Sequence, residues 1–170
     1  LASLTNGNIA LVYSDADSAT DSDIDVQIRD GSGALIVSKA VVSGAVRNDD
    51  VDIAALQGGG FVVTWANNGG GNFDILAKLY DASGIALTGN ISVATTKAGN
   101  QVAPSVVRLS DDSFVIAWAD SGSASLRGQH FSAAGAKLGS EFVIAAGGLN
   151  LVGDVELTAL ADGRFTATWT

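Results

Sequence analysis

An acidic cluster is the part of the sequence best suited to chemistry. Five aspartates fall within eleven residues: Asp15, Asp17, Asp21, Asp23 and Asp25. Calcium prefers several oxygen ligands, and carboxylates from a flexible loop commonly supply them. The cluster therefore predicts a calcium site in a loop, and the alternative is a solvated acidic hairpin that discourages pairing at strand edges.

The spacing of this cluster differs from that of an EF-hand. Residues 21–25 resemble the start of an EF-hand loop, but Val26 stands where that loop needs glycine, and no glutamate occupies its twelfth position. No flanking helix is predicted either. A calcium site here would need another geometry.

Other reactive side chains are scarce. His130 is the only histidine and the sequence contains no cysteine, which excludes thiol chemistry, disulfides and cysteine-based metal sites. A serine triad would have to use His130, but no Gly-x-Ser-x-Gly sequence supports one. Glu141 and Glu156 could form a glycosidase pair only if the fold placed them for that chemistry.

One sequence pattern occurs four times and sets the organisation of the chain. Each copy runs from a leucine through a polar turn into an apolar segment that closes on an aromatic residue. The closing aromatics are spaced by 52, 53 and 51 positions: Tyr13, Trp65, Trp118 and Trp169. A period near 50 residues of strand-type sequence is typical of a β-propeller blade or another stacked β-unit.

Each complete unit is predicted to hold four short strands. The first strands are predicted at 51–56, 104–109 and 155–160, and the second at 9–13, 61–65, 114–118 and 165–169. The third are predicted at 23–29, 74–80 and 125–131, and the fourth at 35–42, 91–94 and 141–145. Alternation places the aromatic residues on one face, where we expect them to form the core. Helical periodicity is absent.

A glycine recurs in the turn that follows each third strand. Gly33, Gly84 and Gly135 are 51 residues apart. A glycine kept at one place in a repeat suggests a backbone position with positive φ, which is costly for residues that carry a Cβ atom. We therefore predict left-handed backbone at these three positions.

The alignment of the units weakens the case for catalysis. His130 aligns with two apolar residues, Ile28 and Leu79, so a structural histidine is the better interpretation. Glu156 aligns with Ser105 and has no distinctive placement. We predict that the protein is not an enzyme.

Composition and charge restrict the classes of partner. Hydrophobic residues make up 47% of the chain and 21 glycines supply turns, as in an ordered, secreted type of β-protein. The net charge is −9, and nine aspartates face three basic residues within 1–52, so nucleic acid and anionic membranes are poor partners. No apolar run is long enough to span a bilayer. The chain begins at Leu1 within a predicted strand, which suggests a segment of a longer protein.

The units resemble the propeller-type tandem repeats of large secreted bacterial proteins, often found with repeats-in-toxin calcium modules or adhesin domains. The third unit carries the resemblance best, in NQVAPSV (100–106), DSFVIAW (112–118), RGQHF (127–131) and GSEFV (139–143). The first unit departs from it, with Tyr13 in place of tryptophan and the acidic cluster in place of the Gly-Gln-aromatic phrase. The resemblance implies an extracellular scaffold or adhesive role and no reaction.

We therefore predict an all-β repeat protein of propeller-like blades. It is expected to form a single array of three complete repeats and a partial one, at about 1–50, 51–103, 104–154 and 155–170. Because a propeller generally needs four or more blades to close, open strand edges at both ends could accept another copy. The predicted function is self-assembly, for example into homo-oligomers or filaments, or surface adhesion. The alternative is calcium-assisted binding of surface glycans.

Overall fold

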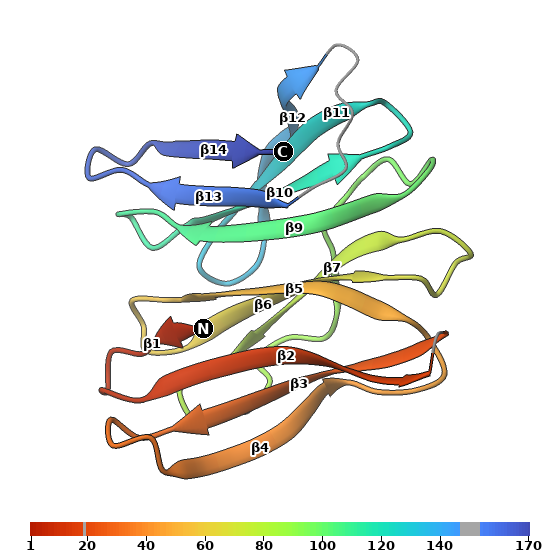
Figure 1. The fold of residues 1–170 in the computed structure, drawn as a ribbon. Helices are drawn as coiled ribbons and strands as arrows, with labels where there is room; N and C mark the ends of the chain where they lie inside the picture. The colour runs from red at the N-terminus through yellow and green to blue at the C-terminus, as the bar shows by residue number, and fades with distance from the viewer. Residues whose placement is uncertain (19, 147–153) are drawn as a thin grey trace.

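The described part of the protein consists of β-strands and turns without a helix. The structure is a computed structural model that describes residues 1–18, 20–146 and 154–170 (Figure 1). Within these ranges there is no helix with the length and apolar character needed to cross a membrane. The predicted all-β class is confirmed.

Three four-stranded antiparallel sheets follow one another along the chain, and in each one the strands lie side by side in sequence order. The first sheet contains β1 (Ala2–Ser3), β2 (Ile9–Ser18), β3 (Asp21–Arg29) and β4 (Leu35–Val42). The second contains β5 (Asn48–Ala55), β6 (Phe61–Asn67), β7 (Asp74–Tyr80) and β8 (Ile91–Ser92). The third contains β9 (Gln101–Arg108), β10 (Phe114–Asp120), β11 (Ser125–Phe131) and β12 (Lys137–Ala146). A fourth, two-stranded sheet contains β13 (Val155–Ala159) and β14 (Phe165–Trp169).

The strands agree closely with the sequence prediction. The bounds of β4, β7 and β11 are the predicted ones, and the second strand of every sheet starts where it was predicted. The largest difference is at the end of β2, which continues five residues beyond the predicted 9–13, and β5, β9 and β12 begin three or four residues earlier than predicted. In β5 and β9 the pairing continues past a register shift, which alternation alone does not reveal.

The three turn glycines have the predicted left-handed backbone. The φ angles of Gly33, Gly84 and Gly135 are 90°, 75° and 83°. The N–H of each glycine donates to the carbonyl oxygen three residues earlier, at 2.9 Å for Gly33 and Asp30. These turns close the third strand onto the segment that follows it.

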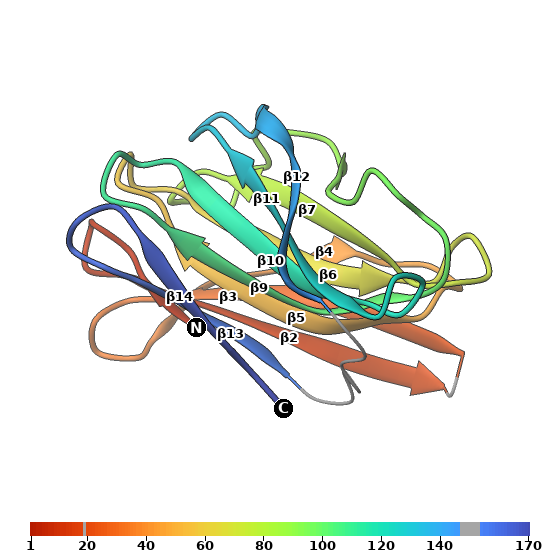
Figure 2. The same ribbon diagram turned by 90° about the horizontal axis from the view of Figure 1, so that it is seen from above.

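The four sheets stack in sequence order, and apolar clusters fill the three junctions between them (Figures 1 and 2). Phe61, Val63 and Trp65 face the first sheet, whereas Val62 belongs to the cluster shared with the third sheet. The alternation of β6 thus places its side chains in two different junctions. Burial of these apolar surfaces is the main stabilising contribution to the stack.

The closing aromatics differ in burial according to their place in the stack. Trp65 and Trp118 are 0% exposed, whereas Trp169 is 39% exposed. Tyr13 is also partly exposed, because Val12 beside it packs toward the second sheet and directs Tyr13 to the opposite face. The prediction that all four aromatics form the core is therefore wrong for the first and last copies, which lie at the ends of the stack.

Candidate functional site

The acidic cluster lies in paired strands rather than in a loop. Asp15 in β2 lies directly opposite Asp23 in β3, and Asp25 lies opposite Tyr13. Because alternate residues of a strand share a face, these three aspartates lie on one face of the first sheet. The prediction of a loop is wrong, because the described aspartates lie in the paired strands of a hairpin. The side chain of Asp17 lies outside the described residues.

Asp23 and Asp21 differ in their described contacts. Asp23 Oδ1 accepts a hydrogen bond of 3.2 Å from the N–H of Gly44, and Oδ1 of Asp21 is buried without a partner among the described residues. Over the described ranges no three acidic or histidine side chains are grouped so that they could hold a metal ion. Calcium binding at this cluster stays a prediction.

His130 has a structural contact in the third sheet. Its Nε2 lies 2.7 Å from Oγ of Ser113, and Asp111 forms a short hydrogen bond to the same hydroxyl. Hydrogen bonds from the Ser113 hydroxyl and N–H lower the pKa of Asp111. In a serine triad the carboxylate orients the imidazole, whereas here it contacts the serine. The arrangement therefore differs from that of a catalytic triad.

Carboxylates gather where the first strands of three sheets meet. A cavity of about 250 Å³ lies between β5, β9 and β13, and its acidic lining residues are Asp50, Asp52, Asp154 and Glu156. Asp50 and Ala103 both have positive φ, 51° and 50°, in the bulged parts of β5 and β9. Oδ2 of Asp50 accepts a hydrogen bond of 3.1 Å from the N–H of Ala103. The two bulges are thus held together across a sheet junction.

The first strands are also connected by a hydrogen bond that recurs from one junction to the next. Oδ2 of Asp52 accepts the N–H of Val106 at 2.8 Å, and Oγ of Ser105 accepts the N–H of Leu157 at 3.1 Å. Asp52, Ser105 and Glu156 hold the same place, because each is paired with the fourth residue of the next strand in its sheet. Glu156 is the third acceptor in this series. It is exposed, and it accepts no hydrogen bond within the described part of the chain.

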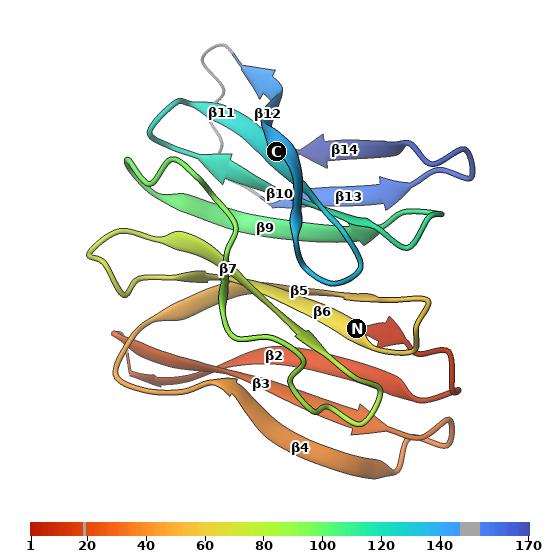
Figure 3. The same ribbon diagram turned by 180° about the vertical axis from the view of Figure 1, so that it is seen from behind.

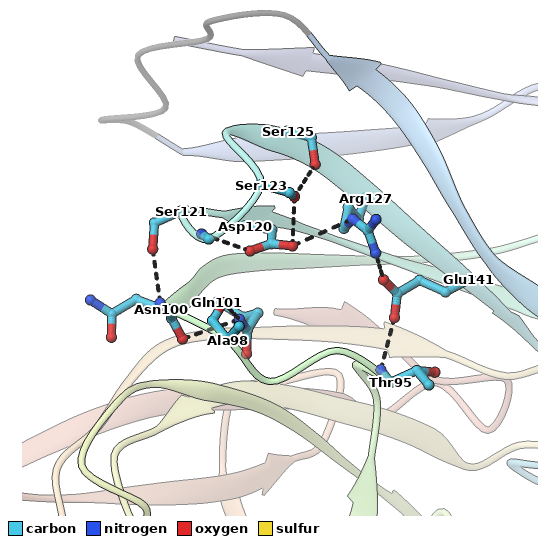
Figure 4. Close-up of polar contacts among 12 residues, drawn as sticks. Thr95, Ala98, Asn100, Gln101, Asp120, Ser121, Ser123, Ser125, Arg127 and Glu141 are labelled. Carbon is cyan, nitrogen blue, oxygen red and sulfur yellow. Dashed lines mark hydrogen bonds and ion pairs between the residues drawn. The ribbon is translucent and has the colours of Figure 1, made fainter.

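A buried ion-pair network lies between the second and third sheets, away from this line of first strands (Figure 4). Arg127 in β11 bonds to Glu141 in β12 through Nη1, and its Nε lies 3.4 Å from Oδ2 of Asp120 in β10. The side chains of Asp120 and Glu141 are 1% and 7% exposed. Oε2 of Glu141 accepts the N–H of Thr95, at 2.8 Å, from the connection between β8 and β9. The network therefore joins the third sheet to the connection that leaves the second sheet.

Further hydrogen bonds hold the acidic end of this network. Oδ1 of Asp120 accepts the N–H of Gly122 at 2.9 Å, and Oδ2 accepts the hydroxyl of Ser123 at 2.7 Å. Oγ of Ser121 accepts the N–H of Asn100 at 2.8 Å, which fixes the start of β9 against the turn after β10 (Figure 4). Buried charges are tolerated when they have several such partners.

Sequence reasoning missed both the ion-pair network and the inner cavity. The sequence predicts a strand that starts at Glu141, whereas the residue lies inside β12 and bonds to Arg127. Glu156 was considered undistinguished, although a polar acceptor recurs at its aligned positions. The recurrence of a polar acceptor at these aligned positions was the signal that could have indicated the site, because apolar residues would be expected at a position buried between sheets.

Comparisons with known proteins assign no family. No protein-family model matches the chain, and no curated protein matches it. The resemblance to propeller-type repeats of secreted bacterial proteins therefore stays a prediction.

Proposed function

We propose that the protein is an extracellular structural or adhesive module of propeller-type repeats. It acts by self-assembly or by adhesion to a surface, and it catalyses no reaction. The repeated strand order of the three complete sheets and their face-to-face stacking support this proposal. A stack of this kind can be extended at its ends without any change to its interior.

The recurring hydrogen bond between first strands is the observation that carries the proposal. In the junctions after the second and third sheets, a side-chain oxygen accepts a backbone N–H of the following sheet. Glu156 offers the next acceptor on the outer face of the fourth sheet, beside the exposed residues Thr158, Thr166 and Thr168. A carboxylate that binds an N–H forms a strong, charge-assisted hydrogen bond. A further sheet could therefore dock there in the same manner.

The opposite end of the stack is the surface that a second copy would offer. The face of the first sheet that is turned away from the second sheet carries Tyr13 together with Asp15, Asp23 and Asp25. The fourth sheet of the other copy would present Glu156 to this face. Both surfaces are acidic, so the two copies repel each other electrostatically. Salt screens such repulsion within about 10 Å at 0.1 M ionic strength. We therefore expect assembly to need salt or a divalent cation.

Light scattering and negative-stain microscopy test the proposal. The purified chain is measured at low salt, at moderate salt with a chelator, and with added calcium. Rings or filaments that form on screening support assembly through the stack ends. A monodisperse monomer under every condition would overturn self-assembly.

A pair of charge-matched variants tests which surface assembles. Glu156→Arg removes the proposed acceptor, whereas Asp162→Arg makes the same charge change in the exposed turn between β13 and β14. We expect Glu156→Arg to abolish assembly and Asp162→Arg to preserve it. Equal behaviour of the two variants would show that net charge, rather than the outer face of the fourth sheet, controls association.

Calcium-assisted carbohydrate binding is the second candidate function. The observation that favours it is the shared face of Asp15, Asp23 and Asp25 beside Tyr13, where a cation and a sugar ring could be held together. Binding of surface glycans that needs calcium and is lost in Asp23→Asn would support this alternative. Glycan binding that is unchanged by a chelator would contradict it.

A further inference from the structure

A second cavity lies beside the ion-pair network, between the third sheet and the connection from β8 to β9. Its volume is about 400 Å³, and its polar lining includes Thr95, Thr96, Arg127, Gln129, Lys137 and Ser140. Its lining residues come from β11, β12 and the connection between β8 and β9. Figure 3 shows these segments from behind. Small-molecule sites commonly have volumes of roughly 300 to 1,000 Å³, so the cavity could hold a ligand of monosaccharide size.

The wall of this cavity is already ordered by the protein. Arg127 is held between Asp120 and Glu141, and Glu141 also binds the backbone of Thr95 (Figure 4). A ligand would therefore meet groups whose conformations are fixed before it binds. Such preorganisation reduces the entropy cost of binding.

Gln129 supplies an unused acceptor at the cavity. The residue is 1% exposed, and its Nε2 donates to the carbonyl oxygens of His130 at 2.9 Å and Gly139 at 3.4 Å. These bonds fix the orientation of the amide, and its Oε1 is left buried without a donor among the described residues. A buried acceptor without a partner costs roughly 1 to 3 kcal/mol. A ligand hydroxyl could satisfy it.

Lys137 supplies an unused cation at the rim. Its ammonium makes no hydrogen bond or ion pair with any described residue. Partial burial and the nearby charge of Lys97 lower the pKa of Lys137. Lys137 is an exposed residue, and an ammonium beside a like charge gains from a bound anion. The hydroxyl groups of Thr95, Thr96 and Ser140 add further donors.

The corresponding place in the first junction is occupied by the protein itself. Lys78 lies opposite Val63 in the second sheet, as Gln129 lies opposite Ile116 in the third. Lys78 Nζ donates to the carbonyl oxygen of Val41, at 3.3 Å, and thus spans the first junction. The shorter Gln129 bonds only within its own sheet. The presence of the shorter Gln129 at the place that corresponds to Lys78 explains why a polar cavity lies at the second junction.

We propose that this cavity binds an anionic, hydroxylated small molecule of the sugar-acid class, such as a hexuronate. Its carboxylate would pair with Lys137, and one of its hydroxyls would donate to Oε1 of Gln129. The proposal is independent of self-assembly, because the cavity lies at an internal junction and not at an end of the stack.

Isothermal titration calorimetry of the whole chain tests this site with three probes: glucuronate, glucose and acetate. Glucuronate offers the carboxylate and the hydroxyls together, so we expect it to bind at least tenfold more tightly than either other probe. No measurable binding of glucuronate at millimolar concentration would overturn the proposal. Equal affinities for acetate and glucuronate would overturn it too, since they would indicate a general anion site.

Three variants locate the binding. Lys137→Gln is expected to weaken glucuronate binding at least tenfold, while Lys39→Gln makes the same charge change in the first sheet and should retain full affinity. Ser140→Phe places a ring at an exposed position of the lining and should block binding without changing Tm. Unchanged affinity in both Lys137→Gln and Ser140→Phe would place the ligand elsewhere and refute the assignment.

Discussion

The first and second junctions of the stack have similar apolar interiors and different polar connections. Each contains a stacked aromatic pair, Phe61 with Tyr80 and Phe114 with Phe131, and both pairs have centroids 5.2 Å apart. Trp65 in the first junction and Trp118 in the second are fully buried. The apolar pattern therefore sets the stacking in the same way at both junctions.

At the first junction the ammonium groups of Lys39 and Lys78 each donate to a carbonyl oxygen across the junction. The buried connection there is formed by neutral groups. Ser22 Oγ donates to the carbonyl oxygen of Asn48 at 2.7 Å and accepts the N–H of the same residue at 2.9 Å. The Asn48 side chain returns a hydrogen bond of 2.8 Å to the carbonyl oxygen of Ser22. Both residues are buried.

At the second junction the connections are charged. Asp52 accepts hydrogen bonds from the third sheet, and Glu141 of the third sheet accepts one from the chain after β8. Arg127 stands where the second sheet has Leu76, because the two residues are paired with Trp118 and Trp65 respectively. The comparison teaches that a common apolar stacking leaves the polar periphery of each junction free to differ.

Replacing the central cation should have the largest effect. Arg127→Met leaves Asp120 and Glu141 buried without their counter-charge, so we expect the free energy of unfolding to fall by about 3 to 5 kcal/mol. Leu76→Met is the matched change in the second sheet and should cost less than about 1.5 kcal/mol. Urea denaturation measures both. Equal losses would show that the two junctions do not differ in the way described.

Removing the Asp52 carboxylate, the acceptor on β5, should have the next largest effect. Asp52→Ala leaves the N–H of Val106 and the hydroxyl of Ser105 without this partner, and we expect a loss of about 1.5 to 3 kcal/mol in the free energy of unfolding. Asp52→Asn keeps an oxygen acceptor and should lose less. A loss in Asp52→Asn as large as that in Asp52→Ala would mean that the charge matters more than the hydrogen bond.

High pH should weaken the first junction selectively. Burial raises the pKa of Tyr80 from 10.0 to about 12, so its phenol stays neutral in the folded protein after it ionises in the unfolded chain. The contribution of Tyr80 to the free energy of unfolding is unchanged below pH 10, and it falls by roughly 2 kcal/mol as the pH rises to 12. Tyr80→Phe should remove this part of the alkaline loss, because phenylalanine does not titrate. Alkaline denaturation curves that coincide for the two proteins would contradict the expectation.

The smallest effect is expected at the lysine that spans the first junction. Lys78→Met removes one hydrogen bond of 3.3 Å and a cation that lies 5.6 Å from the Tyr80 ring centroid. We expect a loss of about 0.5 to 1 kcal/mol in the free energy of unfolding. Lys137→Met should leave stability unchanged, since Lys137 has no described partner to lose. Thermal denaturation of both variants compares them, and a larger loss in Lys137→Met would reverse the assignment.

Local features of the sequence predicted most of the strands and turns. Alternation located β4, β6, β7, β10 and β11, and the recurring glycines located three turns with positive φ. Both signals act within a few residues, so they can be read without knowledge of the tertiary structure. The bulges in β5 and β9 were missed because they interrupt alternation.

The candidate sites were predicted less well because they are assembled from distant segments. The acidic cluster was visible in sequence, but its placement in paired strands depended on the length of the β2–β3 hairpin. Nothing near Glu141 in sequence indicates that it binds the N–H of Thr95, 46 residues earlier. Gln129 likewise belonged to the phrase that carries the family resemblance, and only the tertiary structure shows that it lines a cavity.

The sequence by itself determined an all-β chain with a period near 50 residues, its strand faces and its turn glycines, because these depend on local backbone geometry and apolar alternation. The tertiary structure alone decided which faces are covered, and thus why Trp118 is buried and Tyr13 is partly exposed. It also decided which polar groups meet across a junction. Those contacts depend on the stacking of whole sheets, which no short segment of sequence encodes.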